Sequence, residues 1–311
     1  MNLTKAMCLS AVVASLVTAG CGALQQQPVI PSQAPAAARL ANSSDLLYLI
    51  GSYGARKLSV FTSPAGQPQH SVLMPHGGVY LCSDARGHVF APTYDVIFEY
   101  AHGGRRPIAE IADQGARSDQ CSGDPMTGNL AVINTVKVTS CSVAIFKGAK
   151  GPPAIHTASR FRICQYPAYD ARGNLFVVAS TQTKSYLLEL PYQGDKFTAF
   201  LLNEQLANLY DMHFDGQYLA VQAKELGTED RPIVIYRVKV SGTKLVIVKT
   251  LRFGGWRNQV EYFAVANGYL LTNIGESEVG VWAYPKAGGM LSHFTAVDSP
   301  TSYAISVAPQ R

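Results

Sequence analysis

Cysteine is the residue type whose positions in this sequence say most about chemistry. A thiol can act as a nucleophile, bind a metal or form a disulfide, so each position has to be considered separately. Two cysteines lie near the N-terminus and four lie farther along the chain: Cys8, Cys21, Cys82, Cys121, Cys141 and Cys164. No Cys-x-x-Cys pair occurs, so the sequence favours neither a structural zinc site nor a thioredoxin-like centre. The four later cysteines are an even number, which indicates disulfides in an exported domain.

The histidines do not form a metal-binding pattern. None of the seven has metal-ligand spacing from another on one expected element. The sequence also lacks the G-x-S-x-G, P-loop and H-E-x-x-H motifs. Gly103-Gly104-Arg105-Arg106 has the composition of an anion site, but such a cluster more often marks a solvated turn. We therefore predict no catalytic residue, no bound metal and no cofactor.

Residues 1–20 have the features of an export signal. Lys5 precedes an apolar run from Ala6 to Val17, which is too short to remain as a membrane-spanning helix. The run ends in Thr18-Ala19-Gly20-Cys21, which resembles the lipobox of bacterial lipoprotein precursors. That resemblance implies lipidation of Cys21 and cleavage just before it. The alternative is an ordinary signal peptide, with Cys21 as a later disulfide partner.

Residues 21–44 are expected to be a tether. The segment is rich in Pro, Gln and Ala and shows no period of two or 3.6 residues, so it favours extended conformations. Two or more acyl chains would hold the protein stably at a membrane. Gly22 stands where Asp would be the usual inner-membrane retention signal. We therefore expect a lipid-anchored protein of the cell envelope, at the outer membrane if the cell has two.

The amino-acid composition limits the fold classes that are possible for the domain that follows the tether. The 311 residues are 47% hydrophobic, 15% charged and rich in Gly, Pro and aromatic residues, which excludes a disordered chain and favours β-structure. A formal charge of +5 is too dilute over this length to indicate nucleic acid as a partner.

Two sequence landmarks alternate along residues 45–311. The first is a polar turn followed by an apolar strand, at intervals of 39 to 51 residues; it begins at Asp45, Asp84, Asp124, Asp170, Asp215 and Ala266. The second is an alternating strand followed by glycine, and it begins at Leu58, Val96, Val143, Tyr186, Ile233 and Val279. Six copies in one order, about 44 residues apart, are typical of a β-propeller.

The repeat predicts an all-β fold of six four-stranded antiparallel blades. In each turn the Asp accepts hydrogen bonds from nearby backbone N–H groups, and the Gly supplies a positive φ. The first unit, from Leu46 to Ile50, lacks an inner strand before it. Tyr303-Ala-Ile-Ser-Val-Ala at the far end is expected to supply that strand and close the ring.

The repeats resemble six-bladed propellers of the NHL and SMP-30/gluconolactonase-like superfamily. The resemblance is carried by Asp170-Ala-Arg-Gly-Asn-Leu-Phe-Val, its copies at Asp84 and Asp124, and the V-x-x-F strands that follow. More narrowly, the chain is similar to uncharacterised secreted or lipid-anchored NHL-like bacterial proteins. The resemblance implies an architecture more firmly than an activity.

The repeat also bears on the pairing of the four later cysteines. Cys82 and Cys121 lie two and three residues before their turn aspartates, which places both on inner strands of consecutive blades. We favour Cys82–Cys121, which leaves Cys141–Cys164 across the next blade boundary. Cys121–Cys164 would also join neighbouring inner strands, and free buried thiols are a further alternative.

Enzymatic members of the superfamily bind a divalent cation at the mouth of the axial tunnel, through carboxylate and Asn ligands on inner strands. The resemblance implies Asp211, His213 and Glu261 as candidates here, with Asn134 or Asn273 as further ones. Other blades have Cys, Gln or Tyr at these positions, so the ligand set is not matched residue by residue. A metal-dependent lactonase- or lyase-like enzyme is therefore the alternative hypothesis.

We expect a non-enzymatic binding or scaffold module that is monomeric and holds a protein, peptide or glycan partner. Asp211, His213 and Glu261 are candidate binding residues. Trp256, in Gly254-Gly255-Trp256-Arg257-Asn258, is the best single candidate in a loop. Most of the tyrosines near inner strands are expected to pack between blades, and a minority to line the tunnel mouth, where a ring suits carbohydrate or peptide contacts: Tyr80, Tyr169, Tyr210 and Tyr262. A purely structural envelope component is a third hypothesis.

Overall fold

The structure is a computed structural model. It describes residues 44–51, 54–78, 80–113, 118–134, 140–206, 209–223, 233–254, 262–296 and 300–308. Every described residue belongs to one compact unit within Ala36–Arg311. The predicted signal peptide, nearly all of the predicted tether, Cys21, Trp256 and Glu261 lie outside the described residues. None of the described helices is long and apolar enough to cross a bilayer.

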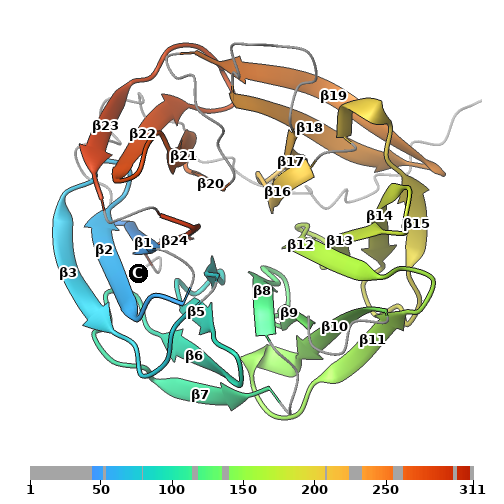
Figure 1. The fold of residues 1–311 in the computed structure, drawn as a ribbon, viewed down its shortest axis with the longest axis horizontal. Coiled ribbons are helices and arrows are strands. Elements are labelled where there is room, and N and C mark those ends of the chain that lie inside the picture. The colour runs from blue at the N-terminus through green and yellow to red at the C-terminus, as the bar shows by residue number, and fades with distance from the viewer. Residues whose placement is uncertain are drawn as a thin grey trace, which may run out of the picture. The chain divides into compact units, whose positions relative to one another are not determined.

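The described residues form six four-stranded antiparallel sheets, arranged as the blades of a propeller around one axis (Figure 1). Blade 1 contains β24 (Ser302–Ser306), β1 (Leu46–Ile50), β2 (Lys57–Thr62) and β3 (Pro68–Leu73). Blade 2 contains β4 (Cys82–Ser83), β5 (Val89–Pro92), β6 (Val96–Tyr100) and β7 (Ala109–Ala112). Blade 3 contains β8 (Ser118–Gly123), β9 (Leu130–Asn134), β10 (Cys141–Phe146) and β11 (Ala154–Ala158).

Blades 4 to 6 follow the same order from the axis outward. Blade 4 contains β12 (Ile163–Tyr169), β13 (Leu175–Ser180), β14 (Ser185–Leu190) and β15 (Thr198–Leu201). Blade 5 contains β16 (Leu209–Phe214), β17 (Leu219–Ala223), β18 (Ile233–Ser241) and β19 (Lys244–Phe253). Blade 6 contains β20 (Phe263–Ala266), β21 (Tyr269–Asn273), β22 (Glu278–Ala283) and β23 (Ser292–Thr295). The short 3₁₀ turns are η1 (Lys147–Ala149) and η2 (Glu204–Leu206). The predicted fold class is confirmed.

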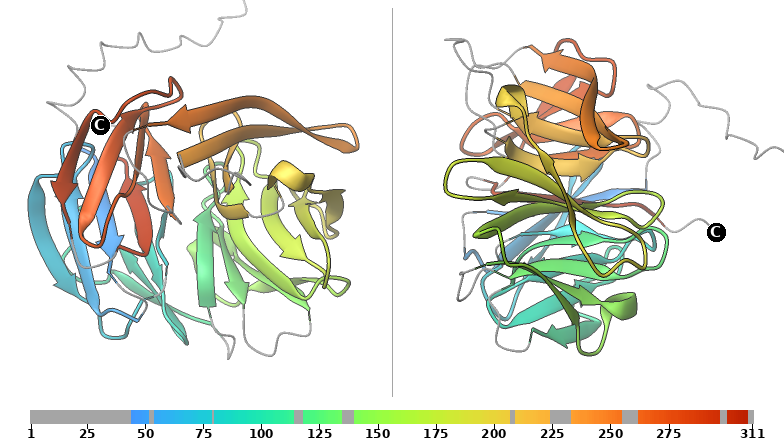
Figure 2. Two further views of the ribbon diagram at one scale, coloured as in Figure 1. Left: turned by 45° about the horizontal axis from the view of Figure 1, so that its top comes forward. Right: turned by 90° about the vertical axis from the view of Figure 1, so that its right-hand side faces the viewer.

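The ring closes through the pairing of its last strand with its first. β24 lies beside β1 (Figure 1), and the two ends of the ring's chain meet in one blade in the views of Figure 2 as well. The two strands are antiparallel, with Leu47 opposite Ile305. Side chains of β24 also bond to blade 2: the Leu81 N–H donates to Ser302 Oγ at 2.7 Å. In return, the Ser83 hydroxyl donates to the Ile305 carbonyl at 2.8 Å. The predicted closure by the C-terminal segment is confirmed.

Apolar packing between blades accounts for the buried second strands. Each of the six clusters of buried apolar residues joins two neighbouring blades, and together they cover every boundary of the ring. In one of them Leu49 of β1 packs with Leu271 of β21, which joins the first blade to the sixth. A strand between two such clusters has apolar neighbours on both faces. β13 is therefore buried along Leu175-Phe-Val-Val-Ala, as its sequence indicates.

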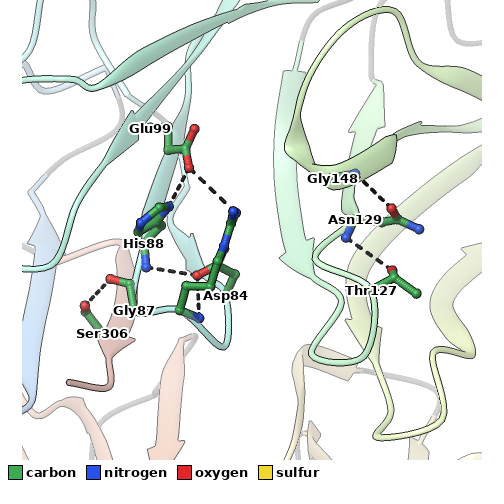
Figure 3. Close-up of polar contacts among 9 residues, drawn as sticks. Asp84, Gly87, His88, Glu99, Thr127, Asn129, Gly148 and Ser306 are labelled. Carbon is green, nitrogen blue, oxygen red and sulfur yellow. Dashed lines mark hydrogen bonds and ion pairs between the residues drawn. The ribbon is translucent and has the colours of Figure 1, made fainter. Parts of the chain in front are cut away.

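The predicted Asp-headed turns join the first and second strands of the blades, and they define one face of the ring, which we call the turn face. In blade 2, Asp84 Oδ1 accepts hydrogen bonds from the N–H groups of Arg86 and His88, both at 2.9 Å, and Gly87 has a φ of 81°. His88 Nδ1 lies 2.6 Å from Glu99 Oε1 (Figure 3). The turn is thus tied to the third strand of its own blade.

Two disulfides join neighbouring blades among the described residues. Cys82–Cys121 links β4 to β8, and Cys141–Cys164 links β10 to β12. This is the pairing that the sequence analysis favours over Cys121–Cys164. Blade 3 is therefore bonded covalently to both of its neighbours.

Candidate functional site

Two cavities follow one another along the propeller axis. The smaller has a volume of about 30 Å³ and includes Asp211 in its wall; we call it the polar chamber. The larger, of about 430 Å³, is lined by residues of the turn face; we call it the vestibule. Residues from five blades line both cavities and form the waist between them: Leu81, Cys121, Pro167, His213 and Tyr303.

Asp211 and His213 meet in the polar chamber. They are two residues apart on β16, so their side chains leave the same face of the strand. His213 Nε2 lies 3.1 Å from Asp211 Oδ2. The Phe263 N–H donates to that same oxygen at 3.1 Å, and the Met212 N–H donates to Oδ1 at 2.8 Å. Both carboxylate oxygens of Asp211 are therefore engaged within the protein.

The Asp211 carboxylate sets the charge of His213. The imidazole lies deep in the ring, but 34% of its side-chain surface is open to the axial cavities. Burial favours the neutral ring, while the charge and hydrogen bond of Asp211 and a backbone hydrogen bond at Phe263 favour the cation. The net effect is to raise the pKa of His213 above its ordinary value. The Asp211 carboxylate therefore favours the protonated imidazole.

Tyrosines and a glutamine complete the polar chamber. The hydroxyls of Tyr80 and Tyr262 lie 3.2 Å apart, and their rings meet edge to face. Burial is the main cause that raises the pKa of Tyr80. Gln120 Oε1 accepts the backbone N–H of Tyr166, which has a positive φ of 54° at a bulge in β12. The remaining space suffices for about two water molecules.

The vestibule has a rim of small or apolar residues, one from each blade. Four of them directly follow a turn aspartate, and the other two come from blades 6 and 1: Ala85, Pro125, Ala171, Gly216, Ala266 and Val307. The two serines in the wall of the vestibule already form hydrogen bonds within the protein. The Ser83 hydroxyl donates to the Ile305 carbonyl, and Ser122 Oγ accepts the Tyr169 N–H at 3.2 Å. The wall of the vestibule is therefore mainly apolar, and its polar groups lie mostly at the waist.

Unlike the serines and Asp211, Tyr303 has a polar side-chain group that forms no hydrogen bond within the described residues. Tyr303 belongs to the closing strand β24, is 3% exposed and is among the residues that line both cavities, while it packs in the apolar cluster between blades 6 and 1. Among the described residues, no hydrogen-bond partner reaches its hydroxyl. Burial raises the pKa of Tyr303 well above its usual range, so the group stays a neutral donor. A buried hydroxyl without a partner indicates a place where water or a ligand atom completes the bond.

The structure brings together only part of the residue set proposed from sequence. Asp211 and His213 share the chamber, while Glu261 and Trp256 lie outside the described residues. Asn134 and Asn273 end the second strands of blades 3 and 6 and line neither axial cavity. Within the described ranges, no three His, Cys, Asp or Glu side chains gather in a group that could hold a metal ion.

Some residues of the site were assigned another role from sequence or were missed. Tyr80 and Tyr262, expected between blades, line the chamber, and Tyr169 lines the vestibule. Tyr210 lines a separate cleft between blades 4 and 5. Tyr303 was recognised as part of the closing strand but not as a site residue. The only signal in the sequence is that Tyr303 stands on an inner strand. The register of that strand decides which of its residues line the axial cavities.

Comparisons with known proteins support the fold. No family model matches the sequence, and no curated protein matches it. A solved protein of unknown function from Bacteroides caccae is similar, with a TM-score of 0.57 and 13% identity over 84% of this chain and 98% of that one. The Kuenenia stuttgartiensis hydrazine synthase has a TM-score of 0.56 and 12% identity over 81% and 84%. The Myceliophteria thermophila Cps50 (Swd1) β-propeller domain has a TM-score of 0.51 and 9% identity over 81% and 89%.

Proposed function

We propose that this protein is a non-enzymatic binding module of the NHL-like type, anchored by a lipid on Cys21 outside the cytoplasmic membrane. Its vestibule would hold part of a protein, peptide or glycan partner. The observation that carries the proposal is the vestibule itself, an axial cavity with a rim of small or apolar residues from all six blades. Its volume of about 430 Å³ falls within the roughly 300–1,000 Å³ of ligand pockets.

The chemistry of the wall favours binding over catalysis. The serines of the vestibule and both oxygens of Asp211 already have partners, so they are poorly placed to act as nucleophile or general base. Rigid, small-residue walls are suited to receiving a matching apolar group.

Two features are consistent with work outside the cytoplasm at the end of a tether. The inter-blade disulfides suit an oxidising compartment. The chain enters the ring on the turn face, where His102 Nε2 lies 3.0 Å from the Ser44 carbonyl oxygen and His102 Nδ1 lies 2.7 Å from Ser306 Oγ. Tether and vestibule would therefore share one face, which would keep a bound partner close to the membrane.

The test combines cross-linking in cells with variants that obstruct the vestibule. A photo-reactive amino acid at Ala171 or at Ala85, both exposed on the rim, should capture a partner that the same group at Leu73 on the outer strand β3 does not. The purified partner should bind the wild-type chain and lose at least about tenfold in affinity for Ala171→Trp. Equal affinity for Ala171→Trp and wild type would refute the vestibule as the site.

The anchor is tested separately. A radiolabelled fatty acid fed to the cells should label the wild-type chain and not the Cys21→Ser variant. Labelling that is unaffected by Cys21→Ser, or no labelling of either chain, would refute the lipid anchor.

The competing function is a metal-dependent lactonase- or lyase-like enzyme with its site at the mouth of the axial tunnel. The Asp211–His213 pair in the polar chamber is the observation in its favour. Elemental analysis of purified protein distinguishes the two. A stoichiometric divalent ion that is lost in Asp211→Asn would support the enzyme, whereas metal-free protein of undiminished stability would support the binding module.

A further inference from the structure

A second concave surface lies away from the axis, between blades 3 and 4. Its volume is about 860 Å³, twice that of the vestibule. Its walls include two turns that join third to fourth strands: 147–153 between β10 and β11, and 191–197 between β14 and β15. We call this surface the blade 3–4 groove.

An asparagine at the equivalent position of each blade fixes each wall of the groove by a hydrogen bond. Asn129 Oδ1 accepts the Gly148 N–H at 2.9 Å, as Figure 3 shows. In the next blade, Asn174 Oδ1 accepts the Tyr192 N–H at 2.9 Å. Each asparagine precedes the leucine that begins the second strand of its blade, and each bonds to the turn after the third strand. The groove therefore lies between two turns that are fixed in place by side chains.

The accessible charge of the groove is positive. Lys147 and Lys150 line it and are exposed, and within the described ranges neither forms an ion pair. Asp124 is the lining carboxylate, but it is 1% exposed and accepts hydrogen bonds from the Met126 N–H at 2.9 Å and from the Thr127 hydroxyl. The charge of Asp124 is thus directed into its own turn, while both ammonium groups remain available.

The rest of the lining is largely apolar and includes one aromatic ring at the surface. Tyr192 is 41% exposed on the blade 4 wall. Further lining residues are Ile145, Pro152, Ala154, Leu175, Leu190 and Pro191. Apolar and aromatic surface with cations beside it is complementary to a chain that carries apolar and acidic side chains together.

We propose that the blade 3–4 groove is a docking site for an acidic peptide segment of a partner protein. Apolar side chains of the segment contact the floor and Tyr192, and its carboxylates pair with Lys147 and Lys150. Lys147, Lys150 and Tyr192 line the groove and not the vestibule, and Tyr169 is the one described lining residue that the two surfaces share.

The test uses the purified full chain in detergent and a phage library of random linear dodecapeptides. Selected sequences should combine Asp or Glu with apolar residues, above their frequency in the library. Fluorescein-labelled synthetic copies should lose about tenfold or more in affinity for the Lys147→Glu/Lys150→Glu variant, because each replacement turns an attraction into a repulsion. Their binding should weaken as salt rises, since the charges are exposed.

A matched variant controls for the change in net charge. Lys239→Glu/Lys244→Glu reverses two exposed lysines on β18 and β19 of blade 5, which do not line the groove, and should bind within twofold of wild type. The Ala171→Trp variant should also bind normally, which separates this site from the vestibule. Peptides without acidic enrichment, or acidic peptides that bind both lysine variants equally, would overturn the proposal. Lysine-dependent binding of sodium polygalacturonate without any selected peptide would overturn the assignment to a peptide.

Discussion

His213 Nε2 lies 3.1 Å from Asp211 Oδ2, and the Phe263 N–H of the next blade donates to that same oxygen. One carboxylate thus joins blade 5 to blade 6 and also sets the protonation of the imidazole that lines both axial cavities. The His213 and Phe263 rings meet edge to face, with centroids 4.8 Å apart, which adds an aromatic contact at the same boundary.

The first prediction concerns pH. The pKa of His213 is raised in the folded protein, so this residue stabilises the fold fully below its unfolded pKa of about 6.5. That contribution is lost as the pH rises through the higher folded pKa. Urea unfolding from pH 5 to 9 should therefore show a fall in stability above about pH 6.5 that is absent from His213→Gln. Identical pH profiles for the two proteins would contradict the charge assignment.

The second prediction concerns the unpartnered hydroxyl. Tyr303→Phe removes a buried polar group that has no bond to lose within the described part of the chain. We expect an unchanged or higher free energy of unfolding, by up to about 1 kcal/mol. Chemical denaturation measures this effect. A loss of stability above about 1 kcal/mol would show that the hydroxyl is bonded in the folded state.

The third prediction concerns the covalent links around blade 3. Cys82→Ala/Cys121→Ala opens a loop with a sequence separation of 39, and Cys141→Ala/Cys164→Ala opens one of 23. Chain entropy predicts losses of about 4 and about 3.5 kcal/mol in the free energy of unfolding. Peptide mapping of the non-reduced protein checks the pairing directly. A Cys121–Cys164 peptide would contradict it.

The fourth prediction concerns a buried ion pair on the turn face. Arg237 Nε donates to Asp215 Oδ2 at 2.6 Å, and the Tyr284 hydroxyl donates to the same oxygen at 2.6 Å. The Asp215 side chain is fully buried. Burial tends to raise the pKa of Asp215, but the bonds from Arg237 and Tyr284 outweigh it and lower the pKa below its ordinary value.

Arg237→Gln should therefore cost about 3–5 kcal/mol in the free energy of unfolding at pH 7, because it leaves a buried carboxylate without its cation. The loss should shrink below pH 4, where Asp215 becomes protonated in the unfolded chain. Arg237→Lys, which keeps the charge, should lose less. A loss below about 1 kcal/mol for Arg237→Gln would show that water screens the pair.

The repeat made the architecture predictable because its signals are local. An aspartate that accepts N–H groups two to four residues away and a glycine with positive φ form a turn wherever they occur, as Asp84 and Gly87 do. Four such turns, the variant copies at Asp45 and Ala266, and the apolar strands between them imply the blades. The missing inner strand of the first blade implied the closure by β24, because an unpaired inner edge would leave backbone groups without partners.

The candidate site was predictable only in part. Asp211 and His213 stand two residues apart on one strand, so their meeting follows from the alternation of side chains along β16. Tyr80 and Tyr262 are 182 residues apart in sequence, and their contact depends on the angle between two blades. The blade 3–4 groove depends likewise on two turns from different blades, 147–153 and 191–197.

The amino-acid order alone thus determined the fold class, the number of blades and the way the ring closes, because hydrogen bonding and apolar periodicity act between neighbours in sequence. The tertiary structure decided which residues line the axial cavities, which of the described buried hydroxyls lack a partner and where positive charge lies beside an apolar groove. Those properties arise from the packing of one blade on the next. That packing brings together residues whose separation in the chain carries no signal of their contact.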